Sequence, residues 1–274
     1  MTSESKISIL HTSTTPTCLC LGSGRFLRSV LVPFLSHDSN VAIFQTRGRS
    51  FLDFLNAPLG DENENLIDSN DAESLKYPVD TVNYNGEITT DHIRICAAGT
   101  LGSNSGKDEL KKLIQNSHLQ VISVGVTEAG LSSAGNQCMI DLTWVLYELY
   151  STNCMNFSDD SKKLCIINTD NVPNNGDVIR EHVFTNANQL FRNEVQRKDM
   201  SFVDYIENKV AFLNSMVDRI TSARTGSGGM VPSCEPLPNK ALVICDPENH
   251  LPNWMAMTDV QKRYGVSIWV MCAL

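Results

Sequence analysis

The sequence predicts an α/β protein with a Rossmann-like, doubly wound and mainly parallel sheet. Segments with helical apolar spacing separate four short apolar runs typical of buried strands, at 17–21, 41–44, 119–126 and 164–167. Strands that alternate with helices in this way build a parallel sheet covered by helices on both faces. The first run ends in Gly22-Ser23-Gly24, a tight turn that leads into apolar helical spacing over 26–35.

The remaining elements follow from local patterns. Alternating residues over 79–95 carry Asn85-Gly86 at their centre, which predicts a β-hairpin with a tight turn. The acidic stretch 61–73 has little apolar content and is expected to be a surface loop. A further strand is expected at 242–244. Apolar spacing predicts four more helices, over 107–116, 137–150, 176–191 and 201–210.

Composition limits the classes of function. The chain has 274 residues, 42% of them hydrophobic, and a formal net charge of −9. The acidic balance and the lack of a Lys/Arg cluster argue against a nucleic-acid partner. No apolar run approaches the roughly 20 residues that span a bilayer, and residues 1–13 lack the pattern of a secretory signal. We therefore expect a cytoplasmic protein without a membrane partner.

The cysteines and histidines do not predict a metal site. The nine cysteines contain no CxxC pair, and several lie inside strand-like runs. Buried, reduced thiols are the expected state of such residues in the cytosol. None of the six histidines has the i, i+4 spacing of a helix-borne zinc site. The sequence therefore favours zinc-independent chemistry.

The glycine turn can hold a phosphate. Gly22 and Gly24 supply two of the three glycines of the dinucleotide-binding fingerprint, while the third position holds Leu27. Small residues let the backbone approach a pyrophosphate, and the N-terminus of the next helix offers free N–H groups. The alternative is an ordinary tight turn between a strand and a helix.

The end of the second strand bears on the choice of nucleotide. An acidic residue there accepts hydrogen bonds from the ribose hydroxyls of NAD, whereas a basic residue suits the extra phosphate of NADP. This chain has Gln45, then Arg47 and Arg49, and no acid before Asp53. Local chemistry is thus compatible with NADP, unless both arginines simply face the solvent.

Three further polar positions follow apolar segments. Thr127-Glu128 closes the most strand-like segment, and Asp170-Asn171 follows the strand at 164–167. The carboxyl ends of parallel strands border the ligand crevice in such folds. Helix capping and turn chemistry are the alternative roles for these residues. Asp218-Arg219 also follows an apolar segment. Its alternative, non-functional role is a salt-bridged pair in a linker between domains.

These segments together resemble the long-chain, zinc-independent polyol dehydrogenases, namely mannitol dehydrogenase and the fructuronate and tagaturonate reductases. The resemblance is carried by Gly22, Gly24, Phe26 and Arg28 in a Gly-x-Gly-x-Phe-x-Arg pattern, by 170–176, and by the most specific match, 214–221. The segments occur in the family's order across about residues 17 to 225.

The resemblance implies an NAD(P)-dependent oxidoreductase that interconverts a small-molecule polyol or sugar acid and its ketose. It implies that Asn171 polarises the reacting carbonyl and that Asp218 contacts substrate hydroxyls, while Arg219 supports the local fold. NAD is the family's commoner cofactor and is the choice expected here, with NADP as the alternative. The residues implied at the cofactor are Gly22, Gly24, Phe26, Arg28, Gln45, Thr127 and Glu128.

One part of the family pattern is not found. The general base of the family is a lysine in a Lys-x4-Asn-x2-His pattern, and neither Lys240 nor Lys262 has the required residues after it. The segment 222–238 is rich in Gly, Ser and Pro and is expected to be a loop between domains. We therefore expect a dinucleotide-binding domain over 1–221, and over 222–274 a linker with an incomplete, truncated start of a helical domain.

Two other functions remain open at the level of sequence. The first is a catalytically inactive nucleotide-binding remnant or regulatory protein. The second is a Rossmann oxidoreductase of another class, for instance one that acts on sugar phosphates, although no separate phosphate clamp is evident.

Overall fold

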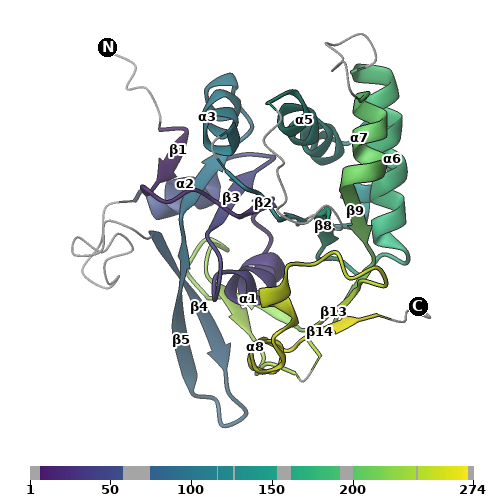
Figure 1. Cartoon of the computed structure of the whole chain (residues 1–274). Helices are drawn as coiled ribbons and strands as arrows, with labels where there is room; N and C mark the ends of the chain where they lie inside the picture. The colour runs from purple at the N-terminus through teal and green to yellow at the C-terminus, as the bar shows by residue number, and fades with distance from the viewer. Residues whose placement is uncertain are drawn as a thin grey trace, which may run out of the picture.

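The centre of the molecule is a seven-stranded sheet with the order β1-β6-β3-β2-β7-β8-β9 (Figure 1). The computed structural model describes residues 7–57, 75–115, 117–125, 127–152, 162–191, 200–238 and 240–270. All neighbouring strands pair in parallel except β1, which is antiparallel to β6 at the edge. The strands are β1 (Ile9–His11), β2 (Cys18–Leu21), β3 (Val41–Gln45), β6 (Ala97–Thr100), β7 (Val121–Val124), β8 (Leu164–Asn168) and β9 (Val210–Leu213).

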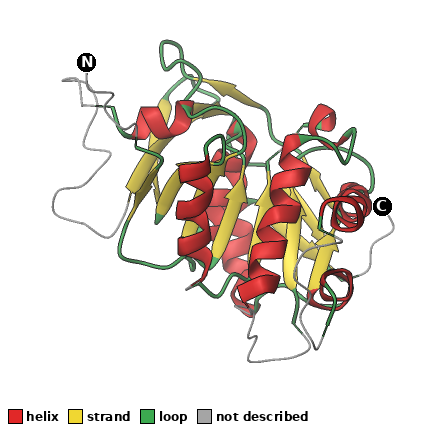
Figure 2. Ribbon diagram, turned by 90° about the horizontal axis from the view of Figure 1, so that it is seen from above, coloured by secondary structure: helices red, strands yellow, loops and turns green. Residues whose placement is uncertain are grey.

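Apolar layers cover both faces of this sheet. Alternate residues of a strand point to opposite faces, so Leu164 and Ile166 of β8 enter one core while Cys165 and Ile167 enter the other. One core is closed by four helices: α3 (Asn104–Gln115), α5 (Gln137–Thr152), α6 (Asn175–Leu190) and α7 (Phe202–Lys209). Figure 2 shows helices packed across the strands of the sheet. The predicted doubly wound, mainly parallel sheet is confirmed.

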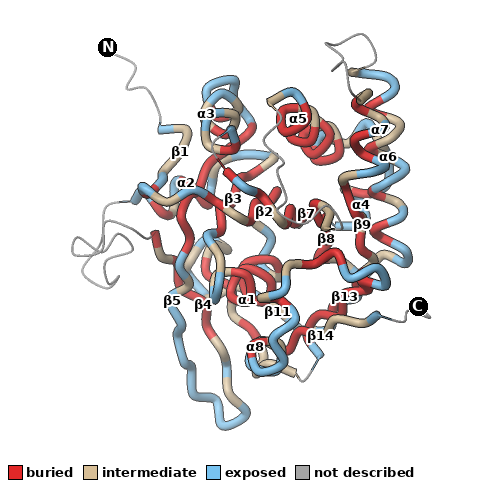
Figure 3. The backbone as a smooth tube through the Cα atoms, viewed as in Figure 1, coloured by how far each residue is buried: buried red, intermediate tan, exposed pale blue. Residues whose placement is uncertain are grey.

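The opposite core is closed by shorter elements. They are η1 (Leu27–Leu31), α1 (Val32–Leu35), α2 (Ser50–Leu55), strands of two smaller sheets, η2 (Asn253–Ala256) and α8 (Thr258–Tyr264). A four-residue helix, α4 (Glu128–Leu131), follows β7. Strands β2, β3, β7 and β8 in the middle of the sheet are buried, whereas β1 at its edge is intermediate to exposed (Figure 3).

The predicted hairpin is also confirmed. Strands β4 (Leu75–Val82) and β5 (Ile88–Ile95) pair antiparallel around Gly86, whose φ of +85° suits a residue without a Cβ. The hairpin projects from the body, and most of β5 is exposed (Figure 3). The acidic stretch 61–73 lies outside the described residues.

The segment after residue 220 contains more strand than its composition indicates. Where a loop was expected over 222–238, β11 (Thr221–Ala223) and β12 (Pro232–Cys234) pair antiparallel, and β12 also pairs in parallel with β4. The strand expected at 242–244 is confirmed as β13 (Leu242–Cys245), which lies between β10 (Ser215–Val217) and β14 (Val266–Trp269). The division of the chain at residue 221 stays a prediction.

The cysteines largely follow the expectation from sequence. Six of the described cysteines are free and buried: Cys18, Cys20, Cys96, Cys138, Cys165 and Cys234. Burial raises the pKa of Cys18 to about 12, so its thiol stays protonated and unreactive near neutral pH. Cys245 departs from the expectation because it is disulfide-bonded.

An ion pair fixes the glycine-rich segment after β11 to the hairpin. Arg224 donates two hydrogen bonds to the carboxylate of Asp80 on β4, from Nε at 2.7 Å and from Nη2 at 2.5 Å. Thr90 on β5 donates a third, at 2.7 Å. These interactions lower the pKa of Asp80, and the hydrogen bond from Arg224 is the largest cause. The pair therefore joins two segments that are far apart in the sequence.

This pair gives a pH-dependent prediction. Because the pKa of Asp80 is lower in the folded state, its contribution is present above the unfolded pKa of about 4 and is lost as pH falls through the folded value. We expect Asp80→Asn to lower the free energy of unfolding by about 2 kcal/mol near pH 7, less than for a fully enclosed pair because Arg224 is partly exposed.

Urea unfolding at several pH values measures this effect. The difference between the variant and the wild type should shrink below pH 4. Asp91→Asn, an exposed residue on the same hairpin, is the control and should change stability little. A constant difference down to pH 3 would contradict the assignment.

Candidate functional site

The turn after β2 requires glycine for two reasons. Gly22 has a φ of +105°, and a Cβ built on it would lie 2.7 Å from the carbonyl oxygen of Gly125, which follows β7. The strand ends are tied at this point, because Gly22 N–H donates to Phe44 O at 2.8 Å and Gly125 N–H to Leu21 O at 2.8 Å. Backbone atoms thus form a cradle that a side chain would fill, which fits a closely approaching phosphate group.

A cavity of about 270 Å³ opens beside this turn, at the carboxyl ends of β2, β3 and β7. Three of the residues predicted at the cofactor line it, namely Gly22, Gln45 and Thr127. The other lining residues are Ser23, Thr46, Arg47, Gly125, Ala129, Gly130, Asn136 and Cys138. Asn136 was not anticipated, and only its place before the helix at 137–150 could have drawn attention to it.

Gln45 ends β3 with its side chain turned toward the next helix. Its Oε1 accepts hydrogen bonds from the backbone N–H groups of Phe51 and Leu52 at 2.9 and 3.2 Å. Its Nε2 lies 3.4 Å from the hydroxyl of Ser50. The amide thus satisfies free N–H groups in the first turn of α2, which lacks a side-chain cap of its own.

Arg28 and Phe26 lie behind the glycine turn and do not line the cavity. The Arg28 side chain is only 1% exposed. Its Nε donates to Ser23 O at 2.9 Å, and Nη1 donates to Met230 O. Its guanidinium carbon lies 4.7 Å from the ring centre of Phe51. Burial is the main cause that lowers the pKa of Arg28 to about 10, so it stays charged at neutral pH.

Thr127 and Glu128 lie at the end of β7. Thr127 has an extended backbone and precedes α4, and its carbonyl accepts hydrogen bonds from Gly130 and Leu131 at 2.6 and 3.2 Å. Glu128 is exposed in the first turn and lies outside the lining of the cavity, as does Gly24. Thr127 thus occupies the N-cap position of α4, although its side chain makes no capping hydrogen bond, and it lines the cavity.

A second cavity of about 470 Å³ lies at the carboxyl end of β8, and it brings Asn171 and Asp218 together. Its walls are the turn after β8 and the segment around β10, with lining residues Asn171, Val172, Pro173, Asn174, Asn214, Ser215, Met216, Val217 and Asp218. Strand β8 neighbours β7 in the sheet. The two cavities therefore lie at the same edge of the sheet.

The Asn171 amide is held in one orientation. Its Oδ1 accepts from the N–H of Val217 at 2.8 Å, and its Nδ2 donates to the carbonyl of the same residue at 2.6 Å. The two backbone partners identify which side-chain atom is oxygen and which is nitrogen, because a flip would place like groups together. One hydrogen of Nδ2 remains available, and Asn171 is exposed.

Other asparagines of the segments 170–176 and 214–221 hold the walls of this second cavity together. Asn175 is fully buried, donates to Asp170 O and Ser215 O at 2.9 Å each, and accepts from Ser215 N–H at 3.0 Å. Asn214 accepts from Gly176 N–H at 2.8 Å and donates to Asp177 at 2.9 Å. These contacts fasten β10 to the start of α6, so the two motifs form one structural unit.

Arg219 fastens the same unit to η1, the helix after the glycine turn. Its Nη1 donates to Ser29 O at 2.8 Å, and Nε and Nη2 donate to Glu235 O at 3.2 and 2.9 Å. Burial lowers its pKa. The neighbouring Asp218 is exposed and lines the cavity, and the ion pairs among the described residues include none between Asp218 and Arg219.

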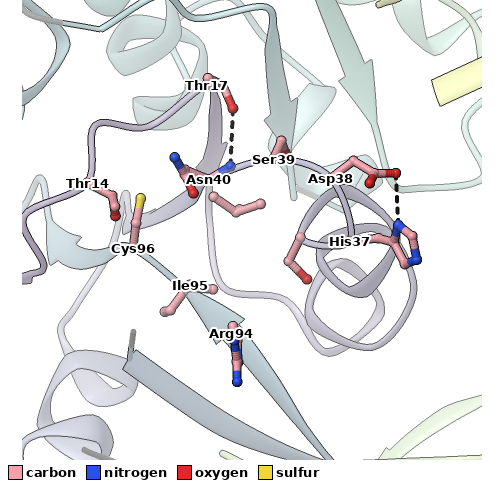
Figure 4. A pocket seen from close by; sticks show the side chains of 11 residues that line it. Thr14, Thr17, His37, Asp38, Ser39, Asn40, Arg94, Ile95 and Cys96 are labelled. Carbon is pink, nitrogen blue, oxygen red and sulfur yellow. Dashed lines mark hydrogen bonds and ion pairs between the residues drawn. The ribbon is translucent and has the colours of Figure 1, made fainter. Parts of the chain in front are cut away.

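A larger cavity, of about 510 Å³, lies at the amino ends of β2 and β3 (Figure 4). Several of its polar groups already have partners within the protein. Thr17 accepts from Asn40 N–H at 3.2 Å, Asn40 donates to Thr15 O at 3.2 Å, and His37 contacts Asp38 at 2.8 Å. We therefore assign the chemistry to the carboxyl edge of the sheet.

Two other kinds of site are absent from the residues that the structure describes. Among them, no three His, Cys, Asp or Glu side chains are grouped as metal ligands. None of their helices is long and apolar enough to cross a membrane.

Comparison with solved structures supports the fold. D-sorbitol dehydrogenase in its substrate-free form aligns with a TM-score of 0.62 and 15% identity, over 94% of this chain and 54% of that chain. The chain thus spans about half the length of that enzyme. A Bacillus subtilis protein described as a probable 2-dehydropantoate 2-reductase aligns with a TM-score of 0.38 and 11% identity, over 92% of this chain and 57% of that chain.

Comparison with protein families is more specific. No curated protein was found to be similar in sequence. The Rossmann domain of mannitol dehydrogenase matches residues 16–247, which include the lining residues of the two cavities at the carboxyl edge of the sheet and the segments 170–176 and 214–221. A dehydrogenase domain of this kind implies a nicotinamide dinucleotide cofactor and a small-molecule substrate. The chain therefore belongs to the mannitol dehydrogenase family.

Proposed function

We propose that the protein is an NAD(P)-dependent oxidoreductase that interconverts a polyol or a sugar acid and its ketose by hydride transfer. The observation that carries this proposal is that Asn171 and Asp218 line one cavity, at the carboxyl end of β8. The neighbouring strand β7 ends at the other cavity, beside the glycine turn. When bound, the nicotinamide group supplies or accepts the hydride.

In this proposal the cavity beside the glycine turn holds the dinucleotide. Gly22 and Gly24 give the backbone close access to the pyrophosphate, Gln45 and Thr127 line the cavity beside the nucleotide, and Glu128 lies just outside this lining. Arg28 and Phe26 act from behind the turn, where Arg28 fixes the carbonyl of Ser23. A turn fixed in this way needs little rearrangement on binding, which favours affinity.

Asn171 is suited to polarise a carbonyl group. Negative charge develops on the carbonyl oxygen as a ketose is reduced, and a donor already aimed at that position stabilises it. The remaining N–H of Asn171 Nδ2 is such a donor, because both atoms of its amide are fixed by Val217. Asp218 is suited to orient the substrate, since a carboxylate accepts hydrogen bonds from sugar hydroxyls.

Turnover with the protein as it stands tests the proposal. We expect oxidation of mannitol, or reduction of fructose or fructuronate, with NAD(H) or NADP(H). Asp218→Asn should raise KM for the sugar about 10- to 100-fold, the range of a hydrogen bond to a charged group. Its melting temperature should be unchanged because the carboxylate is exposed. Asp108→Asn, an exposed aspartate on α3, is the control and should leave KM unchanged.

A second candidate function is nucleotide binding without turnover, as a remnant or a regulatory protein. It is favoured by the lining of the second cavity, where Asp218 is the one titratable side chain among the described residues. Calorimetry separates the candidates, since binding without turnover supports this one. Failure to bind either dinucleotide at millimolar concentration would contradict both.

A further inference from the structure

The cavity beside the glycine turn carries a positive charge in an acidic protein. Arg47 is the single charged side chain among the described residues that line it, although the chain as a whole has a net charge of −9. We infer that this cavity selects NADP(H) over NAD(H), with Arg47 as the residue that binds the 2′-phosphate. The inference rests on the proposed function and departs from the NAD expected from sequence resemblance.

The position that would select NAD offers no acceptor to a ribose. In NAD-binding folds a carboxylate at the end of the second strand accepts hydrogen bonds from the ribose hydroxyls. Here that position is Gln45, whose Oε1 already accepts two backbone N–H groups of α2. The side chain is 5% exposed and neutral. A ribose with a free 2′-hydroxyl therefore gains no charged acceptor from it.

Arg47, in contrast, lines the cavity and can bind a phosphate group there. Its Nη2 donates to Asn136 Oδ1 at 3.2 Å, and both residues line the cavity. The other N–H groups of the guanidinium have no hydrogen-bond partner among the described residues. No carboxylate among the described residues pairs with Arg47.

The neighbouring arginine lacks this freedom. Arg49 Nε lies 2.7 Å from Asp53 Oδ1, and its Nη2 donates to Ile7 O at 3.0 Å. Its charge is thus balanced, and it does not line the cavity. The contrast leaves Arg47 to recognise an anion, because an arginine without a carboxylate keeps its full attraction for phosphate.

Direct binding measurements test the inference independently of activity. Titrations of the whole chain with NADPH and with NADH, followed by calorimetry, should give at least tenfold tighter binding of NADPH. Arg47→Ala should weaken NADPH binding about 10- to 100-fold and leave NADH binding nearly unchanged, as expected when a charge-assisted contact is lost. The preference should also shrink as salt is raised.

Two controls make the result specific. Arg49→Ala removes the same charge two residues away and should preserve the preference for NADPH. Adenosine 2′,5′-bisphosphate and adenosine 5′-monophosphate, used as probes, should show the same discrimination in the wild type and lose it in Arg47→Ala. These outcomes assign the effect to the 2′-phosphate.

The outcomes that overturn the inference are separate from those that overturn the proposed function. Equal affinity of the wild type for NADPH and NADH overturns the selection of NADP(H) and leaves the function intact. A preference that survives in Arg47→Ala overturns the role of Arg47. If neither dinucleotide binds, the proposed function fails and this inference fails with it.

Discussion

Replacing Gly22 by alanine is expected to abolish detectable dinucleotide binding and to lower the free energy of unfolding by about 3 kcal/mol. Two effects add. The φ of +105° is strained for a residue with a Cβ, at a cost of about 1–2 kcal/mol. The new methyl group would also lie 2.7 Å from the Gly125 carbonyl oxygen, so the ends of β2 and β7 must separate. Calorimetry with NADPH and urea unfolding measure the two losses.

Two glycine variants separate these effects. Gly229 has a φ of +85° with nothing near the position of its Cβ, so Gly229→Ala should show the cost of backbone strain alone. A Cβ on Gly24 would be 3.8 Å from Gly125 O, an ordinary contact, so Gly24→Ala should fold normally while it narrows the approach to a phosphate. A Gly22→Ala protein as stable as Gly229→Ala would show that the strand ends yield without cost.

Replacing Arg28 by alanine is expected to destabilise the fold by about 3–5 kcal/mol. The change leaves the carbonyls of Ser23 and Met230 without their donor and opens a cavity beside Phe51 and Tyr77. It also releases the glycine turn, so dinucleotide affinity should fall even though Arg28 does not line the cavity. Urea unfolding and calorimetry measure the two effects.

Arg28→Met and Arg28→Lys show which interaction matters. Methionine keeps most of the volume but donates no hydrogen bond, so Arg28→Met should lie between the wild type and Arg28→Ala in stability. Lysine keeps a charge but lacks the fork that reaches two carbonyls at once, so it should rescue incompletely. Wild-type stability in Arg28→Met would mean that the hydrogen bonds to Ser23 and Met230 contribute nothing net.

The fold could be predicted largely because its signals are local. The buried runs at 17–21 and 164–167, the glycine turn and the Asn85-Gly86 turn each report a backbone state that neighbouring residues decide. The pairing of β12 with β4 could not be predicted in this way. Strands of three residues carry almost no periodic signal, and their partners lie far away in the sequence.

The candidate site was likewise predictable only in part. The resemblance in sequence predicted roles for Asn171 and Asp218, and the structure places both in the lining of one cavity. Sequence could not distinguish a side chain that lines a cavity from one that supports it. Arg28 turns inward to carbonyls on two segments, and Gln45 turns to α2. Thr127 and Glu128 are adjacent, yet only the first lines the cavity.

The sequence by itself determined the alternation of strand and helix, the glycine turn and the residue types at the strand ends, because each depends on backbone preferences and apolar spacing within a few residues. Tertiary structure alone decided which polar groups remain free for a ligand. Packing decides which carbonyls and carboxylates lie next to an arginine side chain, and therefore whether its N–H groups can still bind a ligand. Arg47, Arg49 and Arg28 differ in this respect. Those partners come from other elements of the fold, and no local pattern records them.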